Sequence, residues 1–599
     1  MINNYELIQK GFINLNTNNH ILNRIFRAAL VAMIIADLAE IIAAMIDGML
    51  TGRFLGAESI AAFGIAKPFF SITGVLSAVL SSGALITASH VIGKGDKDST
   101  NQIFSLTCLG GIILSTGFAL TGIIFINQFA SILGANGELF PIVRKYLLGL
   151  LLGVPAIVMG NILTVFMQLE GKYNNVNLSV LATIIVNLGG DTFNIFYLNG
   201  DMFGMGLATS ASYYAALAVL MYGFIANKSM LRLSLLNLKG KIAREIISKG
   251  LPKATRRLCN VFRPVLINHL VITIGGTLAM SAFSIQHSVA EFLELLGTCC
   301  GDVVVLMCGV FYGEENEDEL SDTLRIAFRY VIFGVSAVTL ISFFGAKGIA
   351  SFYLGNQVKA VDMATLCLQL YALKLPFLAF NEIYMNYFQA LGDNKRSHLL
   401  SVLHRLVFIV ASAFILGYFF GIAGVWAAFP VSEILLSLTV VIMAMIHEKK
   451  FPRSLKDMLF LPSGFGIAPE YRFRKEIITK EDALEVSKLA YEFCRKINLS
   501  EKRSLYVSLC VEELGMNTAS YAILDKANQS AEVIISLVRN DLIIRFRDNG
   551  KAFDLTKWVK LFHDNDDPSA HIGIKLLTGL AKEVTYTNSL NTNNVIIKL

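Results

Sequence analysis

Residues 55–65 read LGAESIAAFGI, and residues 275–285 read GGTLAMSAFSI. The two stretches begin 220 residues apart (275 minus 55), and the same offset carries Gly93 onto Gly313. Nearly the same offset relates residues 168–171, QLEG, to residues 389–392, QALG, and Gly206 to Gly424. Short matches arise by chance, but a nearly constant offset over three separate blocks indicates an internal duplication.

Composition places the duplicated region in lipid. The chain has 599 residues, of which 54% are hydrophobic, and its mean hydropathy of +0.58 is too high for an ordinary soluble protein. Charged residues are concentrated at the end of the chain, since 37 of the 96 (51 basic and 45 acidic) lie in residues 470–599. None lies between Asp98 and Glu138 or between Arg405 and Glu433. Both gaps exceed the roughly 20 apolar residues that span a bilayer.

Apolar stretches between turn signals predict an α-helical polytopic membrane protein with twelve transmembrane helices in two six-helix repeats. With six helices per half, both halves begin on the same side, so they are parallel repeats with the substrate expected between them near the midplane. The predicted helices are 25–50, 58–92, 100–126, 139–167, 174–198, 204–227, 250–273, 279–311, 321–345, 358–389, 397–420 and 422–446.

The distribution of Lys and Arg predicts the orientation. One set of loops holds 18 of them, nine of these between Lys228 and Arg257, and the intervening loops hold five. By the positive-inside rule the first set is cytoplasmic, which places both termini in the cytoplasm of a multi-pass plasma-membrane protein. The first 20 residues are polar and Asn-rich, so we expect no cleavable signal peptide. Topology accounts for the basic excess, and we expect no nucleic-acid partner.

Six regions follow from this division. They are a cytoplasmic N-terminal segment (1–24), the first repeat (25–227), a cytoplasmic loop (228–249), the second repeat (250–446), a linker (447–470) and a soluble α+β domain (471–599). In the soluble domain, apolar spacing predicts helices around 483–493 and over 502–523. Alternating residues predict a hairpin of 531–538 with 542–547, a short helix from about Ile572, and strands near 583–588 and 594–599.

Ionisable side chains inside the predicted spans point to a transport site, because such groups are costly in lipid. Asp37, Glu40 and Asp47 share one face of the first helix, and Asn187, Asp191 and Asn194 share one face of the fifth. Carboxylate and amide oxygens suit a proton or a hard cation such as Na⁺. The alternative is that these groups only tie helices together by hydrogen bonds. Ion coupling is favoured for Asp47 and Asp191, and the structural role for Asp37 and Glu40.

The second half carries a different set of charges. Arg256, Asn260 and Arg263 lie on one face of the seventh helix, and His287, Glu291, Glu294 and Asp302 lie on one face of the eighth. We predict an ion pair of Arg263 with Glu291 or Glu294, and the alternative is a substrate-binding cluster. An acidic loop at residues 314–322 is either solvated or docks on a basic cytoplasmic surface.

The motifs resemble one transporter family. DGMLTGRFLG at residues 47–56, GKGD at 93–96, and the series Asn187, Asp191, Gly204, Gly206, Ala208 and Thr209 are similar to the multidrug and toxic compound extrusion (MATE) family over about residues 20–447. The resemblance implies cation- or proton-coupled antiport of small organic compounds, with Asp47, Asn187, Asp191 and Thr209 forming the ion site. The seventh helix departs from some multidrug members because it has no carboxylate.

The soluble domain carries motifs suited to a nucleotide. Glu513 and Asn517 are four residues apart on one helix face, as a base and a magnesium ligand would be. Asp548 could accept a bond from an adenine amine, Gly550 permits close approach, and Gly573 begins a helix whose N-terminus favours phosphate.

In this order, these elements resemble the GHKL-type ATP-binding domain of anti-sigma-factor serine kinases over about 475–599. The resemblance implies Mg-ATP binding, with Glu513 as the catalytic base, Asn517 as the metal ligand and Asp548 as the adenine reader. Two features depart from the family. The phosphate loop keeps one clear glycine, and Tyr521 replaces the usual histidine.

Three functions fit the sequence. The first is secondary active efflux with a nucleotide-binding regulatory domain. The second is a lipid-linked precursor flippase, which the intramembrane acids disfavour. The third is a membrane-anchored serine-kinase-like signalling protein. An ATP-driven pump is not expected, because no Gly-x-x-x-x-Gly-Lys-Ser/Thr loop occurs. If the ATPase fold has lost its activity, we expect it to serve as a regulatory module or to bind a cytoplasmic protein.

Overall fold

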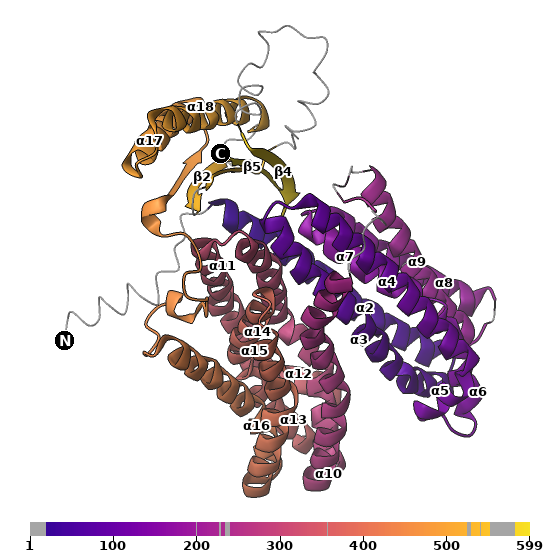
Figure 1. Ribbon diagram of the computed structural model, residues 1–599. Coiled ribbons are helices and arrows are strands. Elements are labelled where there is room, and N and C mark those ends of the chain that lie inside the picture. The colour runs from indigo at the N-terminus through magenta and orange to yellow at the C-terminus, as the bar shows by residue number, and fades with distance from the viewer. Residues whose placement is uncertain are drawn as a thin grey trace.

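Two bundles of helices carry a small sheet domain at one end (Figure 1). The computed structural model describes residues 20–198, 200–226, 229, 231–233, 240–355, 358–523, 529–538, 541–550 and 581–599. The bundles converge beneath the sheet domain and diverge away from it (Figure 1).

The first bundle contains the helices of the first repeat. They are α2 (His20–Phe54), α3 (Ala57–Gly93), α4 (Lys97–Ile124), α5 (Ile126–Ile132), α6 (Leu139–Leu151), α7 (Val154–Leu169), α8 (Tyr173–Phe196) and α9 (Met202–Ala226). Helices α6 and α7 meet at a bend of 43° and together are long and apolar enough to form one span. Pro155 lies at the start of α7, where its missing N–H costs no helical hydrogen bond.

The second bundle contains the helices of the second repeat. They are α10 (Gly240–Gly313), α11 (Glu317–Tyr330), η1 (Val331–Val335), α12 (Ser336–Leu354), α13 (Val358–Ala372), α14 (Leu375–Ala390), α15 (Asn394–Val402), η2 (Leu403–Val407) and α16 (Phe408–Glu448). Two glycines break the longest helices, since the φ angles are 65° at Gly276 in α10 and 60° at Gly421 in α16. An L side chain rarely adopts such an angle, so glycine permits the chain to turn there.

These breaks account for the predicted number of spans. Among the described residues, nine helices are long and apolar enough to cross a membrane, or ten with the bent pair. The 74 residues of α10 fold back on themselves, because Gly250 and Gly313 both lie against α3, at Val79 and His90. Counting the glycine-broken stretches 240–313 and 394–448 as two spans each gives the twelve predicted helices.

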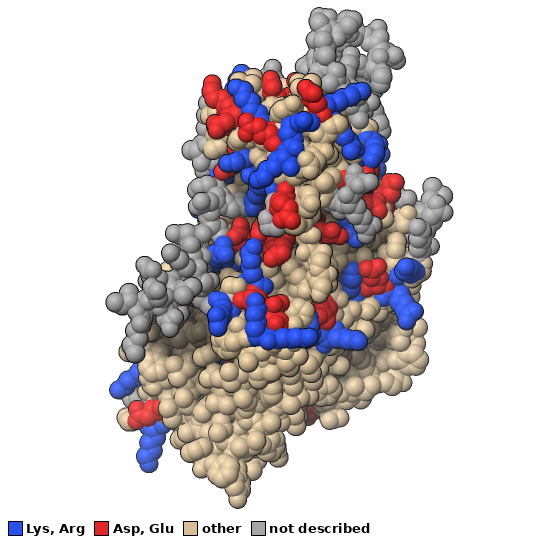
Figure 2. All heavy atoms as spheres, turned by 60° about the vertical axis from the view of Figure 1, so that its left-hand side comes forward, with Lys and Arg blue, Asp and Glu red and all other residues tan. Residues whose placement is uncertain are grey.

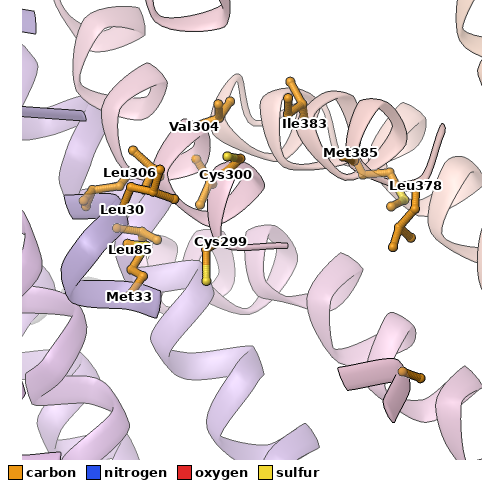
Figure 3. Close-up of a cluster of buried hydrophobic side chains, with 14 of the residues drawn as sticks. Leu30, Met33, Leu85, Cys299, Cys300, Val304, Leu306, Leu378, Ile383 and Met385 are labelled. Carbon is orange, nitrogen blue, oxygen red and sulfur yellow. The ribbon is translucent and has the colours of Figure 1, made fainter. Parts of the chain in front are cut away.

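The two bundles pack closely where they converge. A Cβ atom added to Gly83 of α3 would lie 1.8 Å from the carbonyl oxygen of Ile246 in α10, so only glycine permits this approach. The buried core crosses the same seam: Leu30, Met33 and Leu85 of the first repeat lie near Cys299, Cys300 and Leu306 of the second (Figure 3).

The soluble domain is a five-stranded antiparallel sheet with two helices on one face. Its elements are β1 (Arg472–Ile477), α17 (Lys480–Lys496), α18 (Glu501–Asn517), η5 (Thr518–Ala522), β2 (Ala531–Val538), β3 (Asp541–Asp548), β4 (Glu583–Ser589) and β5 (Thr592–Lys598). The strand order is β1-β2-β3-β5-β4. Alternate residues of β2, β3 and β5 pack on α17 and α18 in a second core, which includes Val533, Ile544 and Ile597.

Most of the predicted elements of this domain are confirmed. The hairpin and the two last strands lie where alternation places them, and α18 ends at Asn517 before a π turn, earlier than the predicted 523. Strand β1 was not predicted, because its RFRKEI sequence is too charged to suggest a strand. The predicted helix near Ile572 lies outside the described residues.

The segment after α16 packs against the helices of the second repeat. Met458, Leu459 and Phe460 are at most 4% exposed, and the Tyr387 hydroxyl of α14 donates a hydrogen bond of 2.8 Å to the Leu459 carbonyl. The predicted linker therefore runs over the second repeat as an ordered strap before β1. Charged side chains gather over the sheet domain and the adjoining helix ends, whereas the lower part of the same face shows few of them (Figure 2).

Candidate functional site

An acidic pair lies inside the first repeat. Asp191 of α8 is 1% exposed, and the Asn187 amide one turn earlier donates a hydrogen bond of 3.3 Å to its Oδ2. The carboxyl group of Asp47 from α2 is in hydrogen-bonding contact with that of Asp191. The structure therefore brings together three of the four residues predicted for the ion site, from two helices that are far apart in sequence.

Two carboxyl groups in contact cannot both stay charged without a proton or a cation between them. Within the described part of the chain, Asp191 Oδ1 is buried without a hydrogen-bond partner. A proton or a cation shared by the two carboxyl groups would relieve their mutual repulsion.

Among the described contacts, the fourth predicted residue forms no hydrogen bond with this pair. Thr209 of α9 is 9% exposed, and its hydroxyl donates to the Met205 carbonyl at 3.1 Å, within its own helix. Tyr146 of α6, which the sequence analysis missed, is 2% exposed and lies within electrostatic range of Asp47 and Asp191. A phenol within an apolar span is a feature that the sequence shows. The sequence does not show, however, that α6 packs near α2 and α8.

The other acids of α2 face a different neighbour. The Cys299 thiol of α10 donates to Asp37 Oδ2 at 3.4 Å, so Asp37 lies against the second repeat. The long helix α2 crosses from one repeat to the other, as the stacking of Phe26 on Tyr330 of α11 also shows. Asp37 and Asp47 share a helix face, as predicted, but do not form one site.

A buried network of charges occupies the second repeat, and it corrects the predicted pairing of Arg263. Glu294 pairs with Lys374 at 2.5 Å and also accepts a bond from the Tyr371 hydroxyl. Among the described residues, Arg263 has no carboxylate within ion-pair distance. Glu294 instead finds its counter-charge in Lys374, which lies in the segment between α13 and α14 and is distant in sequence from both predicted helices.

The rest of this network also contains close ion pairs. Glu382 of α14 joins Arg256 at 2.8 Å and Arg405 at 2.5 Å, and His404 contacts Glu433 at 2.8 Å. Arg256, for which no partner was predicted, pairs with Glu382 of α14. Such a network ties α10, η2, α14 and α16 together in the buried interior.

Removing Lys374 should therefore destabilise the protein strongly. We expect Lys374→Met to cost roughly 3–5 kcal/mol, because it leaves Glu294 buried without its counter-charge, and the double change with Glu294→Gln to cost less than the sum of the single changes. Thermal unfolding in detergent measures both. Lys450→Ala, whose side chain is 57% exposed, is the control and should leave the unfolding temperature nearly unchanged. Additive losses would show that these residues are not coupled.

The predicted nucleotide residues lie on two elements of the soluble domain. On α18, the Asn517 amide donates to Glu513 Oε1 at 2.9 Å, so the predicted base and metal ligand are paired on one face. At the end of β3, Asp548 Oδ1 accepts bonds from the Gly550 N–H at 2.9 Å and from the Asn593 amide at 2.8 Å. Burial raises the pKa of Asp548 to about 6.

This chemistry fits a Mg-nucleotide in part. Magnesium is usually held by one or two protein oxygens together with substrate phosphates, and Glu513 and Asn517 offer two such oxygens. The described residues include no group of three or more acids, histidines or cysteines that would hold a metal alone. Asn593, which positions Asp548, was missed because its strand gave no motif. Gly573 of the predicted phosphate loop lies outside the described residues.

Residues 32–193 and 252–415 match the MatE family, one segment in each repeat. The chain belongs to the MatE family. Residues 479–599 match the histidine kinase-like ATPase domain. This MatE protein therefore carries a second domain of a different family behind its transporter, as the resemblance predicted.

Relatives of known name cover the transporter part. The multidrug export protein MepA of Staphylococcus aureus is 24% identical over 434 residues, which are 71% of this chain and 94% of that protein. MepA of Staphylococcus saprophyticus is 25% identical over 433 residues, covering 72% and 95%.

Solved structures share the fold. An outward-facing multidrug resistance MATE transporter superimposes with a TM-score of 0.65 at 22% identity, covering 72% of this chain and 95% of that one. A transporter from Pyrococcus furiosus, described by the reverse polarity of its binding pocket, gives 0.65 at 21% identity with the same coverage. The MATE transporter fold is thereby confirmed for the twelve helices.

Proposed function

We propose that this MatE protein is a secondary active efflux transporter that exchanges H⁺ or Na⁺ for small organic compounds, with a C-terminal domain that binds nucleotide and regulates transport. The observation that carries the proposal is the contact of Asp47 with Asp191 in a buried polar site. The division into regions at 25–227, 250–446 and 471–599 belongs to the same proposal.

The exchange follows from the geometry of the acidic pair. Without a proton or cation the two carboxyl groups repel each other, and with one they are drawn together. Because they belong to α2 and α8, occupancy of the site biases the relative position of these helices. A gradient that loads and unloads the site can therefore drive a conformational change.

The export of drugs is inferred from the relatives, which are named multidrug export proteins. The cytoplasmic location of both termini rests on the Lys and Arg bias. Lys94, Lys97 and Lys172 belong to the basic set, and the glycines of their loops, Gly95 and Gly171, lie against Ile596 and Asn591 of the soluble domain.

The C-terminal domain is proposed to regulate and not to power transport. Bound Mg-ATP would bring negatively charged phosphate groups to the domain, and this charge would alter the contacts between the domain and the helices. Glu513 and Asn517 would hold the metal, and Asp548, with Asn593 beside it, would read the base.

Reconstitution into proteoliposomes tests the function. Uptake of cationic dyes by the full chain should depend on an imposed H⁺ or Na⁺ gradient, and Mg-ATP inside or outside should change its rate without replacing the gradient. Dye uptake driven by ATP alone, or gradient-independent uptake, would overturn the proposal.

Two other functions remain as outcomes of that test. Transbilayer movement of a lipid-linked anionic precursor would indicate a flippase, which is disfavoured because Arg256, Arg405 and Lys374 are neutralised by acidic partners. Transfer of phosphate from ATP to a serine of an added protein would indicate a membrane-anchored signalling kinase.

Nucleotide binding should be weak and depend on magnesium. With one clear glycine in the phosphate loop, we expect an affinity no better than tens of micromolar, or about −6 kcal/mol. Asn517→Ala should weaken Mg-ATP binding further, and Asp548→Ala should reduce the preference for adenine over guanine. Calorimetry on the full chain measures both, with the exposed Glu485→Ala as the control.

The pH should also matter for this binding. Ionised Asp548 is the proposed acceptor, and its pKa is about 6, so we expect affinity to fall as the pH is lowered from 7 to 5. If calorimetry shows no heat with Mg-ATP at any of these pH values, the domain is a protein-binding module instead.

A further inference from the structure

The second face of the sheet is occupied by the transporter. Because successive side chains of a strand point to opposite faces, Arg545 and Arg547 of β3 point away from α17 and α18. The Arg547 guanidinium lies 2.7 Å from Glu319 at the start of α11 and 2.7 Å from Glu314 just after α10. Arg547 and Glu319 are 2% and 0% exposed. The acidic loop at residues 314–322 was predicted to be either solvated or docked on a basic surface. Its pairing with Arg547 shows that it is docked.

The same face also reaches the first repeat. One guanidinium nitrogen of Arg545 pairs with Glu314 of the second repeat, and the other donates to the Gly93 carbonyl at the end of α3 at 3.1 Å. At the β4–β5 turn, the Leu590 N–H donates to the Leu169 carbonyl at the end of α7 at 2.9 Å. Leu590 is 2% exposed and packs within the transporter core. One domain therefore contacts both repeats.

These contacts lie over the seam where the repeats meet. A Cβ atom on Gly93 would be 2.3 Å from the Val310 carbonyl oxygen, and one on Gly313 would be 2.3 Å from that of His90. The two helix ends thus touch at backbone distance directly beneath Arg545, whereas the bundles diverge at the far end (Figure 1). Alternating access to a site between parallel repeats requires these ends to separate.

We propose that the transporter-facing side of this sheet is a releasable clamp, which holds the two repeats together at this end and keeps the transporter closed there. The clamp deepens the regulatory role under "Proposed function" and rests on it. Its two arms are the Arg547–Glu314–Glu319 cluster on the second repeat and the Leu590 turn on the first. Arg545 joins the arms across the seam.

The clamp lies one residue away from the proposed nucleotide site. In the paired strands β3 and β5, Arg547 is opposite Asn594 and Asp548 is opposite Asn593. Arg547 Nε donates to Asn594 Oδ1 at 2.9 Å on the transporter face, and Asn593 donates to Asp548 on the other. A nucleotide that engages Asp548 would compete with or reorient Asn593, and a shift of these strands would move Arg547. Nucleotide occupancy is therefore the signal that the clamp can sense.

A reversible cross-link tests whether the clamp must open. A Cβ atom on Gly95, in the loop before α4, would lie 3.9 Å from the Cβ of Thr585 in β4, within the range of a disulfide. In the Gly95→Cys/Thr585→Cys variant we expect oxidation to reduce gradient-driven transport at least tenfold and reductant to restore it. The single variants are the controls, and all eight native cysteines are buried. Full transport with the cross-link formed would overturn the clamp.

A distance measurement provides a test that depends neither on transport nor on the Gly95→Cys change being tolerated. Spin labels at the exposed positions Asp98 in the first repeat and Lys395 in the second report the separation of the repeats at this end. We expect one short distance in the parent chain and an added longer population in Arg545→Ala. Lys582→Ala, which removes an exposed pair with Asp541, should leave the distance unchanged. An unchanged distribution in Arg545→Ala would overturn the clamp.

The two tests separate the clamp from the nucleotide proposal. In one outcome the cross-link stops transport and Arg545→Ala opens the seam, but Mg-ATP alters neither the distance nor transport. This outcome would support the clamp and contradict its control by nucleotide. If Mg-ATP alters transport while the cross-linked chain still transports at the full rate, the clamp falls and regulation acts elsewhere.

Discussion

Asp47→Asn and Asp191→Asn should each abolish gradient-coupled transport while leaving the protein folded. An amide keeps the size and polarity of the side chain but cannot gain and lose a proton or supply a negative charge to a cation. We expect rates below about one per cent of the parent, because a proton-transferring group typically contributes about 10²–10⁴-fold. Dye uptake into proteoliposomes under H⁺ and Na⁺ gradients measures the loss.

The control for this prediction is Asp201→Asn. Asp201 pairs with Lys145 at 2.6 Å, but both side chains are more than half exposed, so its loss should leave transport within about twofold. Elution as a monodisperse species and an unchanged unfolding temperature would show that the Asp47 and Asp191 variants are folded. Parent-like uptake with the same ion dependence in both of these variants would remove the acidic pair from the coupling mechanism.

Arg547→Ala should detach the soluble domain. The change leaves Glu314 and Glu319 facing the sheet without their main counter-charge, and Glu532 of β2 lies 4.0 Å from the same guanidinium. Loss of one partner of a buried ion network costs roughly 3–5 kcal/mol. We expect faster proteolysis between residues 447 and 471 and a separate, lower unfolding transition for the soluble domain.

Lys598→Ala is the matched control in the same sheet. Lys598 pairs with Glu583 at 2.7 Å, but the two side chains are 37% and 54% exposed, so the change should cost at most about 1 kcal/mol. Arg547→Lys should recover only part of the docking, because an ammonium group cannot bridge several carboxylates as the guanidinium fork does. Parent-like protease resistance of Arg547→Ala would show that the apolar Leu590 arm suffices to hold the domain.

Many of the structural features could be predicted from sequence because they follow from periodicity and solvent. A bilayer requires about 20 apolar residues per span, so the apolar stretches predict the twelve helices. The constant offset between matching segments predicts the duplication. The alternation in residues 531–547 likewise predicts a strand pair, since one face of the sheet must be dry. Asp47 and Asp191 could be identified because an ionisable side chain within a membrane span is energetically costly and usually functional.

Contacts between distant helices were not predictable in this way. The Arg263 pairing was wrong because helix faces were compared between neighbours, whereas Lys374 approaches Glu294 from a segment 80 residues further along. Tyr146 and Asn593 were missed because their roles depend on which elements fold against them. Two alternatives were left open for the acidic loop at 314–322, because the sheet that docks on it is more than 200 residues away in the sequence.

The sequence by itself determined the two six-helix repeats, the change of solvent near residue 470 and the buried carboxyl groups, because each follows from the local cost of placing a residue in lipid or water. Only the tertiary structure decided that Asp47 meets Asp191, that Asp37 faces the other repeat, and that Arg545 spans the seam while Arg547 contacts the second repeat. These contacts depend on the relative placement of elements far apart in the chain, which is fixed by how their surfaces fit and not by the composition of any one of them.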